Sequence, residues 1–138
     1  MRRRTFLAAT ATGVSTTLAG CGMVGGSGDA DVEMVKNAYV PETFEATVGE
    51  PVVWVNNGSR GHTVTAYEDG LPEGADYWAS GGFESEAAAR SGFWEEGGEG
   101  TVRSGETWSY TFETPGTYPY FCVPHERAGM VGTVVVSE

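Results

Sequence analysis

Basic residues are scarce in this chain of 138 residues, which carries 8 Lys and Arg against 19 Asp and Glu. Three of the eight bases, Arg2 to Arg4, stand at the very start, so the chain beyond residue 20 keeps 5 bases against 19 acids, a net charge of −14. A surface of this charge repels polyanions, which excludes nucleic acid as a partner.

Long apolar runs are also lacking, and none reaches the ~20 residues that a transmembrane helix needs. The segment Arg3-Arg4-Thr5-Phe6-Leu7 is typical of a twin-arginine export signal, and Leu18-Ala19-Gly20-Cys21 resembles the lipobox at which lipoprotein precursors are cut. We therefore predict a signal peptide over residues 1–20, a lipid on Cys21 and a flexible tether over 21–30. The protein would then be anchored at the outer face of the cytoplasmic membrane. The alternative is a plain signal peptide that is cut nearby.

Helix-forming stretches are few, whereas glycine is frequent, with 21 residues. From residue 31 onward, short segments of alternating apolar and polar residues recur between turn signals, which predicts an all-β domain over 31–138, a Greek-key β-sandwich. The predicted strands cover residues 31–36, 51–56, 62–67, 107–112, 117–123 and 131–136.

A glycine-rich, acidic excursion over residues 68–100 interrupts this pattern, with a short helix expected over 84–90. We expect its aromatic residues to fold back onto the sandwich as a cover, and the alternative is a surface that docks a partner. These aromatic residues are Trp78, Phe83, Phe93 and Trp94.

Cysteine is limited to Cys21 and Cys122, a pair that in an exported protein suggests a disulfide. Each has a better-supported role, because Cys21 is the expected lipid site and Cys122 opens the run Cys122-Val-Pro-His125-Glu-Arg-Ala-Gly-Met130. A type 1 copper site uses two His nitrogens and one thiolate, with a distant Met thioether on the axis. The spacing of Cys122, His125 and Met130 on one loop matches that donor set.

Histidine is equally scarce, so the second imidazole must come from His62, the only other histidine of the chain. Other sites fit less well: zinc takes Met poorly as a ligand, and an iron site of two His and one carboxylate would leave Cys122 unused. Two histidines do not suffice for a second copper centre. The sequence therefore predicts one copper ion bound by His62, Cys122, His125 and Met130.

Several motifs resemble those of cupredoxins, and most closely those of halocyanins, the plastocyanin-like lipoproteins of halophilic archaea. They are Tyr39-Val-Pro-Glu-Thr-Phe44, Val53 to Asn57, Gly61-His-Thr-Val64, Ser80-Gly-Gly-Phe83 and Pro115 to His125, together with Met130 to Val136. The resemblance implies a β-sandwich, copper and one-electron transfer rather than enzyme catalysis. Thr63 and Gly61 depart from the plastocyanin pattern, which usually has Asn after the first His and often has Pro before it, so the axial environment and the redox potential do not carry over.

The resemblance also implies that an edge of His125 near the surface passes the electron. An apolar patch of Val123, Pro124, Ala128 and Val131 would surround it and suit brief contacts with membrane-bound or extracellular redox proteins. We expect a monomer. A copper storage or delivery protein and a structural module without redox work are the alternatives.

Overall fold

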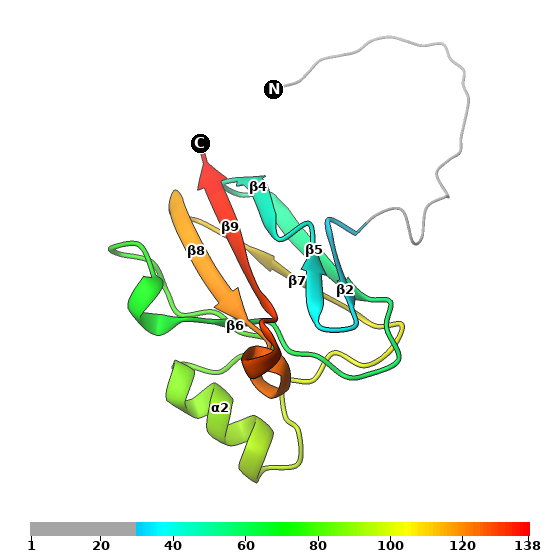
Figure 1. Cartoon of the computed structure of the whole chain (residues 1–138). Helices are drawn as coiled ribbons and strands as arrows, with labels where there is room; N and C mark the ends of the chain where they lie inside the picture. Colours follow the sequence, from blue (N-terminus) through cyan, green and yellow to red (C-terminus); the bar gives the residue numbers. More distant parts are fainter. Residues whose placement is uncertain (1–29) are drawn as a thin grey trace, which may run out of the picture.

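The computed structural model describes residues 30–138, which form two packed β-sheets and one α-helix (Figure 1). The strands are β2 (Val32–Val35), β3 (Ala38–Val40), β4 (Thr43–Thr47), β5 (Pro51–Asn56), β6 (Thr65–Ala66), β7 (Thr107–Thr111), β8 (Gly116–Phe121) and β9 (Val131–Ser137). The helix is α2 (Glu86–Glu95), and two 3₁₀ turns are η2 (Glu68–Gly70) and η3 (Val123–Ala128).

Each sheet has four strands, in the orders β3-β2-β5-β7 and β4-β9-β8-β6. Both sheets are mixed, because β2 pairs in parallel with β5 and β4 pairs in parallel with β9, while the other pairs are antiparallel. The predicted all-β sandwich is thus confirmed. Among residues 30–138, no helix combines the length and apolar character needed to cross a membrane.

Aromatic side chains fill the space between the sheets. Trp54, Trp78 and Tyr120 are buried, with ring centroids 5.6 to 5.8 Å apart. The Trp54 indole N–H donates to the Tyr120 hydroxyl at 3.1 Å, which satisfies both polar groups inside the core. This core packs the two sheets together. It thereby holds the end of β8, from which the loop with Cys122 begins.

One predicted strand differs in extent from the observed one, and one sequence motif is divided between two strands. The strand expected over 62–67 shortens to β6, because His62 and Thr65 each form a single bridge instead of a continuous ladder. His62 bridges to Val102, just after the excursion, and Thr65 bridges to Ala79 within it. The segment 39–44 divides at Pro41 into the end of β3 and the start of β4, which lie in different sheets.

The excursion carries α2, which begins and ends later than the helix expected over 84–90. Ser85 caps it by accepting a hydrogen bond from the Ala88 N–H at 3.1 Å. Trp78 is buried in the core, as the cover interpretation predicts. Trp94 contradicts that interpretation, because 63% of its surface is exposed.

Candidate metal centre

The loop that follows β8 brings Cys122, His125 and Met130 together at the end of the sandwich farthest from the C-terminus, beside α2 (Figure 1). Three backbone hydrogen bonds close it: the His125 N–H donates to the Cys122 carbonyl, the Met130 N–H to the His125 carbonyl, and the Cys122 N–H to the Met130 carbonyl, at 3.1 to 3.2 Å. Gly129 has a φ of 91°, a conformation that glycine adopts without steric cost, and so lets the chain turn into β9. These backbone hydrogen bonds therefore hold the loop in a closed turn.

His62 lies on the segment that links β5 of one sheet to β6 of the other, and its side chain reaches the ligand loop. Its backbone pairs with Val102 through two hydrogen bonds of 2.7 and 3.2 Å. Asn56 holds the preceding turn, because its amide group donates to the carbonyls of Arg60 and Val102, and its oxygen accepts from the Gly58 N–H. Sequence analysis did not identify Asn56 as a support of the site.

Three donor atoms meet between these segments. The two Nδ1 atoms of His62 and His125 are 3.1 Å apart, and the Cys122 sulfur lies 3.7 and 3.3 Å from them. First-row ions such as Zn²⁺ bind nitrogen at about 2.0–2.1 Å and sulfur at about 2.3 Å, so one shared ion requires separations below about 4.2 Å for N–N and 4.4 Å for N–S. All three distances meet this requirement, and the donors fit a soft, first-row ion.

Burial sets the protonation of these groups in the copper-free protein. It lowers the pKa of His62 to about 4 and also lowers that of His125, so both imidazoles are neutral at pH 7 with a free lone pair. Burial raises the pKa of the Cys122 thiol to about 11. Metal binding must therefore release a proton from the thiol, and a bound cation would stabilise the buried thiolate.

Thr63 supports the ligands in a way that sequence analysis missed. Its N–H donates to the Cys122 sulfur at 3.4 Å, and its hydroxyl accepts from the Val123 N–H at 2.9 Å. In the sequence, Thr63 stands out only as a departure from the plastocyanin pattern. Because it joins the His62 segment to the Cys122 loop, it stabilises the site from outside the donor set.

The structure describes Met130 and Cys122 but not Cys21. Met130 is fully buried at the end of the ligand loop, and its backbone bonds with both Cys122 and His125. Cys122 is a free, buried thiol. Cys21, the predicted lipid site, and the signal peptide and most of the tether lie outside the described residues. The ligand and lipid roles stay predictions.

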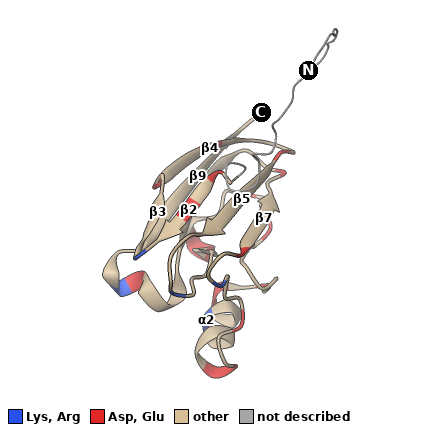
Figure 2. Ribbon diagram, turned by 90° about the vertical axis from the view of Figure 1, so that its right-hand side faces the viewer, with Lys and Arg blue, Asp and Glu red and all other residues tan. Residues whose placement is uncertain are grey.

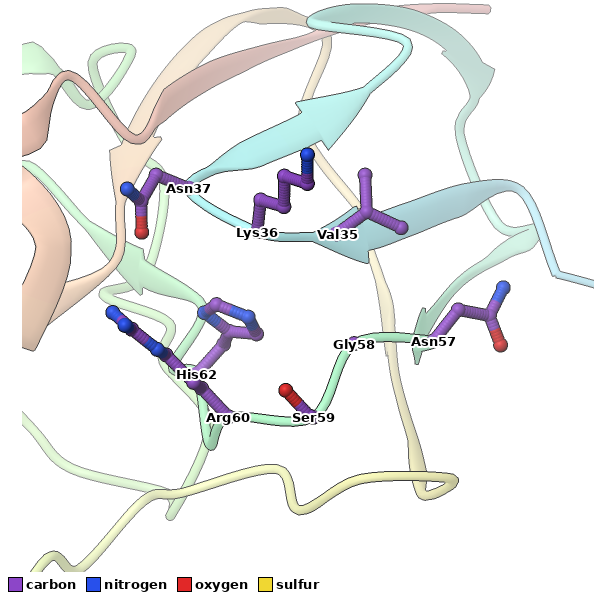
Figure 3. A pocket seen from close by; sticks show the side chains of 8 residues that line it. All are labelled: Val35, Lys36, Asn37, Asn57, Gly58, Ser59, Arg60 and His62. Atoms are coloured by element: carbon purple, nitrogen blue, oxygen red, sulfur yellow. The ribbon is translucent and has the colours of Figure 1, made fainter.

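A cavity of about 600 Å³ lies beside His62 and contains neither Cys122 nor His125 in its lining (Figure 3). Lys36 and Arg60 line it together with amide and hydroxyl side chains, and no carboxylate takes part. The Nε2 atom of His62 is buried and has no hydrogen-bond partner in the described part of the chain. The cavity thus adjoins the donor cluster from outside and is not the metal position.

Comparison with known proteins now bears on this arrangement. Residues 27–137 match the family described as copper binding proteins of the plastocyanin/azurin family. The plastocyanin of Vicia faba is 37% identical over 100 residues, which cover 72% of this chain and 88% of that protein.

This chain belongs to the plastocyanin/azurin family of copper-binding proteins. A structure of an amicyanin mutant matches with a TM-score of 0.56 at 25% identity, covering 81% of this chain and 85% of that one. A purple cupredoxin from Nitrosopumilus maritimus matches in fold with a TM-score of 0.53 at 24% identity, covering 79% of this chain and 100% of that one. Copper is thus the cofactor, and the cupredoxin is of the electron-carrier class.

Charge is unevenly spread over this cupredoxin. Figure 2 shows the Lys and Arg residues in the half of the molecule that holds α2 and the metal centre. Lys36 and Arg60 line the cavity beside His62, while Arg90 and Arg127 line a second cavity beside the ligand loop. Among residues 30–138, four of the five Lys and Arg residues therefore line cavities beside the donor cluster or the ligand loop.

Proposed function

We propose that this cupredoxin carries single electrons by cycling one type 1 copper ion between Cu(II) and Cu(I), with His62, Cys122, His125 and Met130 as its ligands. The observation that carries the proposal is the convergence of the His62, Cys122 and His125 donor atoms within 4.8 Å of one another. Met130 would supply the fourth ligand, because it is a fully buried thioether that ends the same loop.

The bound copper supplies the redox chemistry, since it takes up and gives back one electron without bonding to a substrate. The residues of the chain keep the donors in place through the backbone bonds of the loop and the Thr63 contacts. Burial of His62, Cys122 and Met130 keeps solvent away from three of the four ligands. A site held in this way limits the movement of the ligands between the two oxidation states. Electron transfer needs no catalytic acid or base, so we assign no enzyme activity.

The electron would leave through His125, the only half-buried residue among the four. Pro124 and Val131 are half-buried and Ala128 is exposed, so they supply the apolar surface around it. Val123 was expected in the same patch, but only 5% of its surface is exposed, so it is buried and adds little to the apolar surface. A small patch of this kind suits brief contacts of a monomer with membrane-bound or extracellular redox proteins.

We also propose that the protein is a halocyanin-like lipoprotein tethered to the outer face of the cytoplasmic membrane. The support is in the sequence, namely the Arg pair, the lipobox ending at Cys21 and the glycine-rich segment that follows. Replacement of Cys21 by Ser is expected to release the protein into the medium. If the Cys21→Ser protein stays with the membrane fraction, the anchor is wrong.

The carrier function is tested by controlled-potential cycling of the copper-loaded protein. We expect one electron per copper in each direction, with the visible absorption bleached and restored over many cycles and the ion retained. A storage or delivery protein would instead lose copper to a chelator on reduction, and a structural module would bind no stoichiometric copper. Either of these outcomes contradicts the carrier proposal.

A further inference from the structure

Arg90 of α2 joins the excursion to the ligand loop by hydrogen bonds. Its guanidinium donates two hydrogen bonds to the Glu126 carboxylate, at 2.8 and 3.3 Å. A further bond of 2.9 Å joins its Nε to Glu86, one turn earlier on the helix. Glu126 directly follows His125, so Arg90 binds the loop one residue from a proposed copper ligand.

Arg90 also contacts Phe121, the residue that precedes Cys122. The Arg90 guanidinium carbon lies 4.3 Å from the centroid of the Phe121 ring, and Tyr67 stacks on that ring with centroids 4.4 Å apart. The Tyr67 hydroxyl donates to the Glu126 carboxylate at 2.5 Å. Phe121 and Glu126 therefore flank the segment from Cys122 to His125, and Arg90 contacts both of them.

Arg90 also changes the charge near the metal centre. The ion pair of Arg90 and Glu126 is partly shielded from water, with 35% of the Arg90 side chain and 29% of the Glu126 side chain exposed. A two-bond contact between guanidinium and carboxylate is among the stronger polar contacts in proteins. Without Arg90, the Glu126 carboxylate would keep its hydrogen bond from Tyr67 but only one nearby cation, the exposed Arg127. An unneutralised negative charge favours Cu(II) over the less positive Cu(I).

We propose that Arg90 positions the copper-ligand loop and raises the redox potential by neutralising Glu126, an inference that rests on the proposed copper site. This gives the excursion a role that differs from both the passive cover and the docking surface considered from the sequence. Arg90 acts through Phe121 and Glu126 and does not itself touch the metal donors.

The charge part of the proposal is tested by the midpoint potentials of copper-loaded Arg90→Gln, Glu126→Gln and the double variant. Arg90→Gln should lower the potential, Glu126→Gln should raise it, and the double variant should return close to the original value. Glu45→Gln, an exposed change on β4, is the control and should leave the potential unchanged. If both single variants shift the potential in the same direction, or by no more than the control, the charge role is overturned.

The positioning part is tested without copper, by amide hydrogen exchange of the His125 and Met130 N–H groups. Loss of charged hydrogen bonds should speed their exchange about tenfold to a hundredfold in Arg90→Gln, while β5 amides are unaffected. Arg90→Lys keeps the charge without the two-bond fork, so it should restore the potential but not the slow exchange. Unchanged exchange in Arg90→Gln overturns positioning; failure of the original protein to bind copper overturns the proposed function instead.

Discussion

Asn56 connects the core strand β5 to the His62 segment, and its removal gives the most direct measure of how that segment is held. Its side chain makes three hydrogen bonds, of 2.7 and 2.8 Å to the carbonyls of Arg60 and Val102 and of 2.9 Å from the Gly58 N–H. The residue is fully buried. Asn56→Ala therefore removes three bonds from a turn that leads directly to a proposed ligand.

The expected loss follows from the partners left behind. Each buried hydrogen bond contributes about 0.5–1.5 kcal/mol net, and an unsatisfied buried partner costs about 1–3 kcal/mol. The Val102 carbonyl keeps a second bond, from the His62 N–H, so it is not left unsatisfied. We expect the free energy of unfolding to fall by about 2–4 kcal/mol, a large share of the about 5–15 kcal/mol typical of a domain.

Urea unfolding of the copper-free protein measures this loss. The midpoint of Asn56→Ala should fall by about 1 M or more at an unchanged slope, since slopes are typically about 1–3 kcal/mol/M. Asn57→Ala is the matched control, because its side chain is exposed and should alter stability by less than about 0.5 kcal/mol. Equal midpoints for the two variants would refute the account of how the His62 segment is held.

Three further predictions concern the core and the titration of the site. Gly132→Ala should lower stability by about 1–3 kcal/mol in thermal unfolding, because the added Cβ would lie 2.7 Å from the buried Tyr120 ring; an unchanged Tm contradicts this. Trp78→Ala should cost about 3–5 kcal/mol and Trp94→Ala less than about 0.5 kcal/mol, and equal losses would show that burial is misassigned. In the copper-free protein the pKa of His62 lies at about 4, below its ordinary value of 6.5, so the unfolded chain binds the proton first. Stability should then decrease as the pH falls from about 6.5 to about 4, and a Tm that stays constant over this range would contradict it.

The donor cluster was largely predictable because three of the four proposed ligands lie on one short loop. Cys122, His125 and Met130 are close in sequence, so a single turn at Gly129 brings them together. His62 followed from the scarcity of histidine. Asn56 was not predictable as a support, because its partner Val102 lies 46 residues away in the sequence and reaches it only through the fold.

The strands were predictable where alternation is regular, as in β5, β7, β8 and β9. The excursion was harder, because local signals compete there. Gly92 lies just past the helix expected over 84–90, yet α2 runs through it to Glu95. At Gly92 an added Cβ would lie 2.5 Å from the Phe83 ring, so this glycine serves close packing instead of ending the helix.

The central claim is that one copper ion is held by a site built on Cys122, and the measurement that tests it most directly is a Cu(II) titration of the copper-free protein. We predict an intense blue absorption that saturates at one copper per chain and disappears on reduction. Cys21→Ser, a matched change at the other cysteine, should keep the absorption, and Cys122→Ser should abolish it. An equally intense absorption in Cys122→Ser would contradict the account.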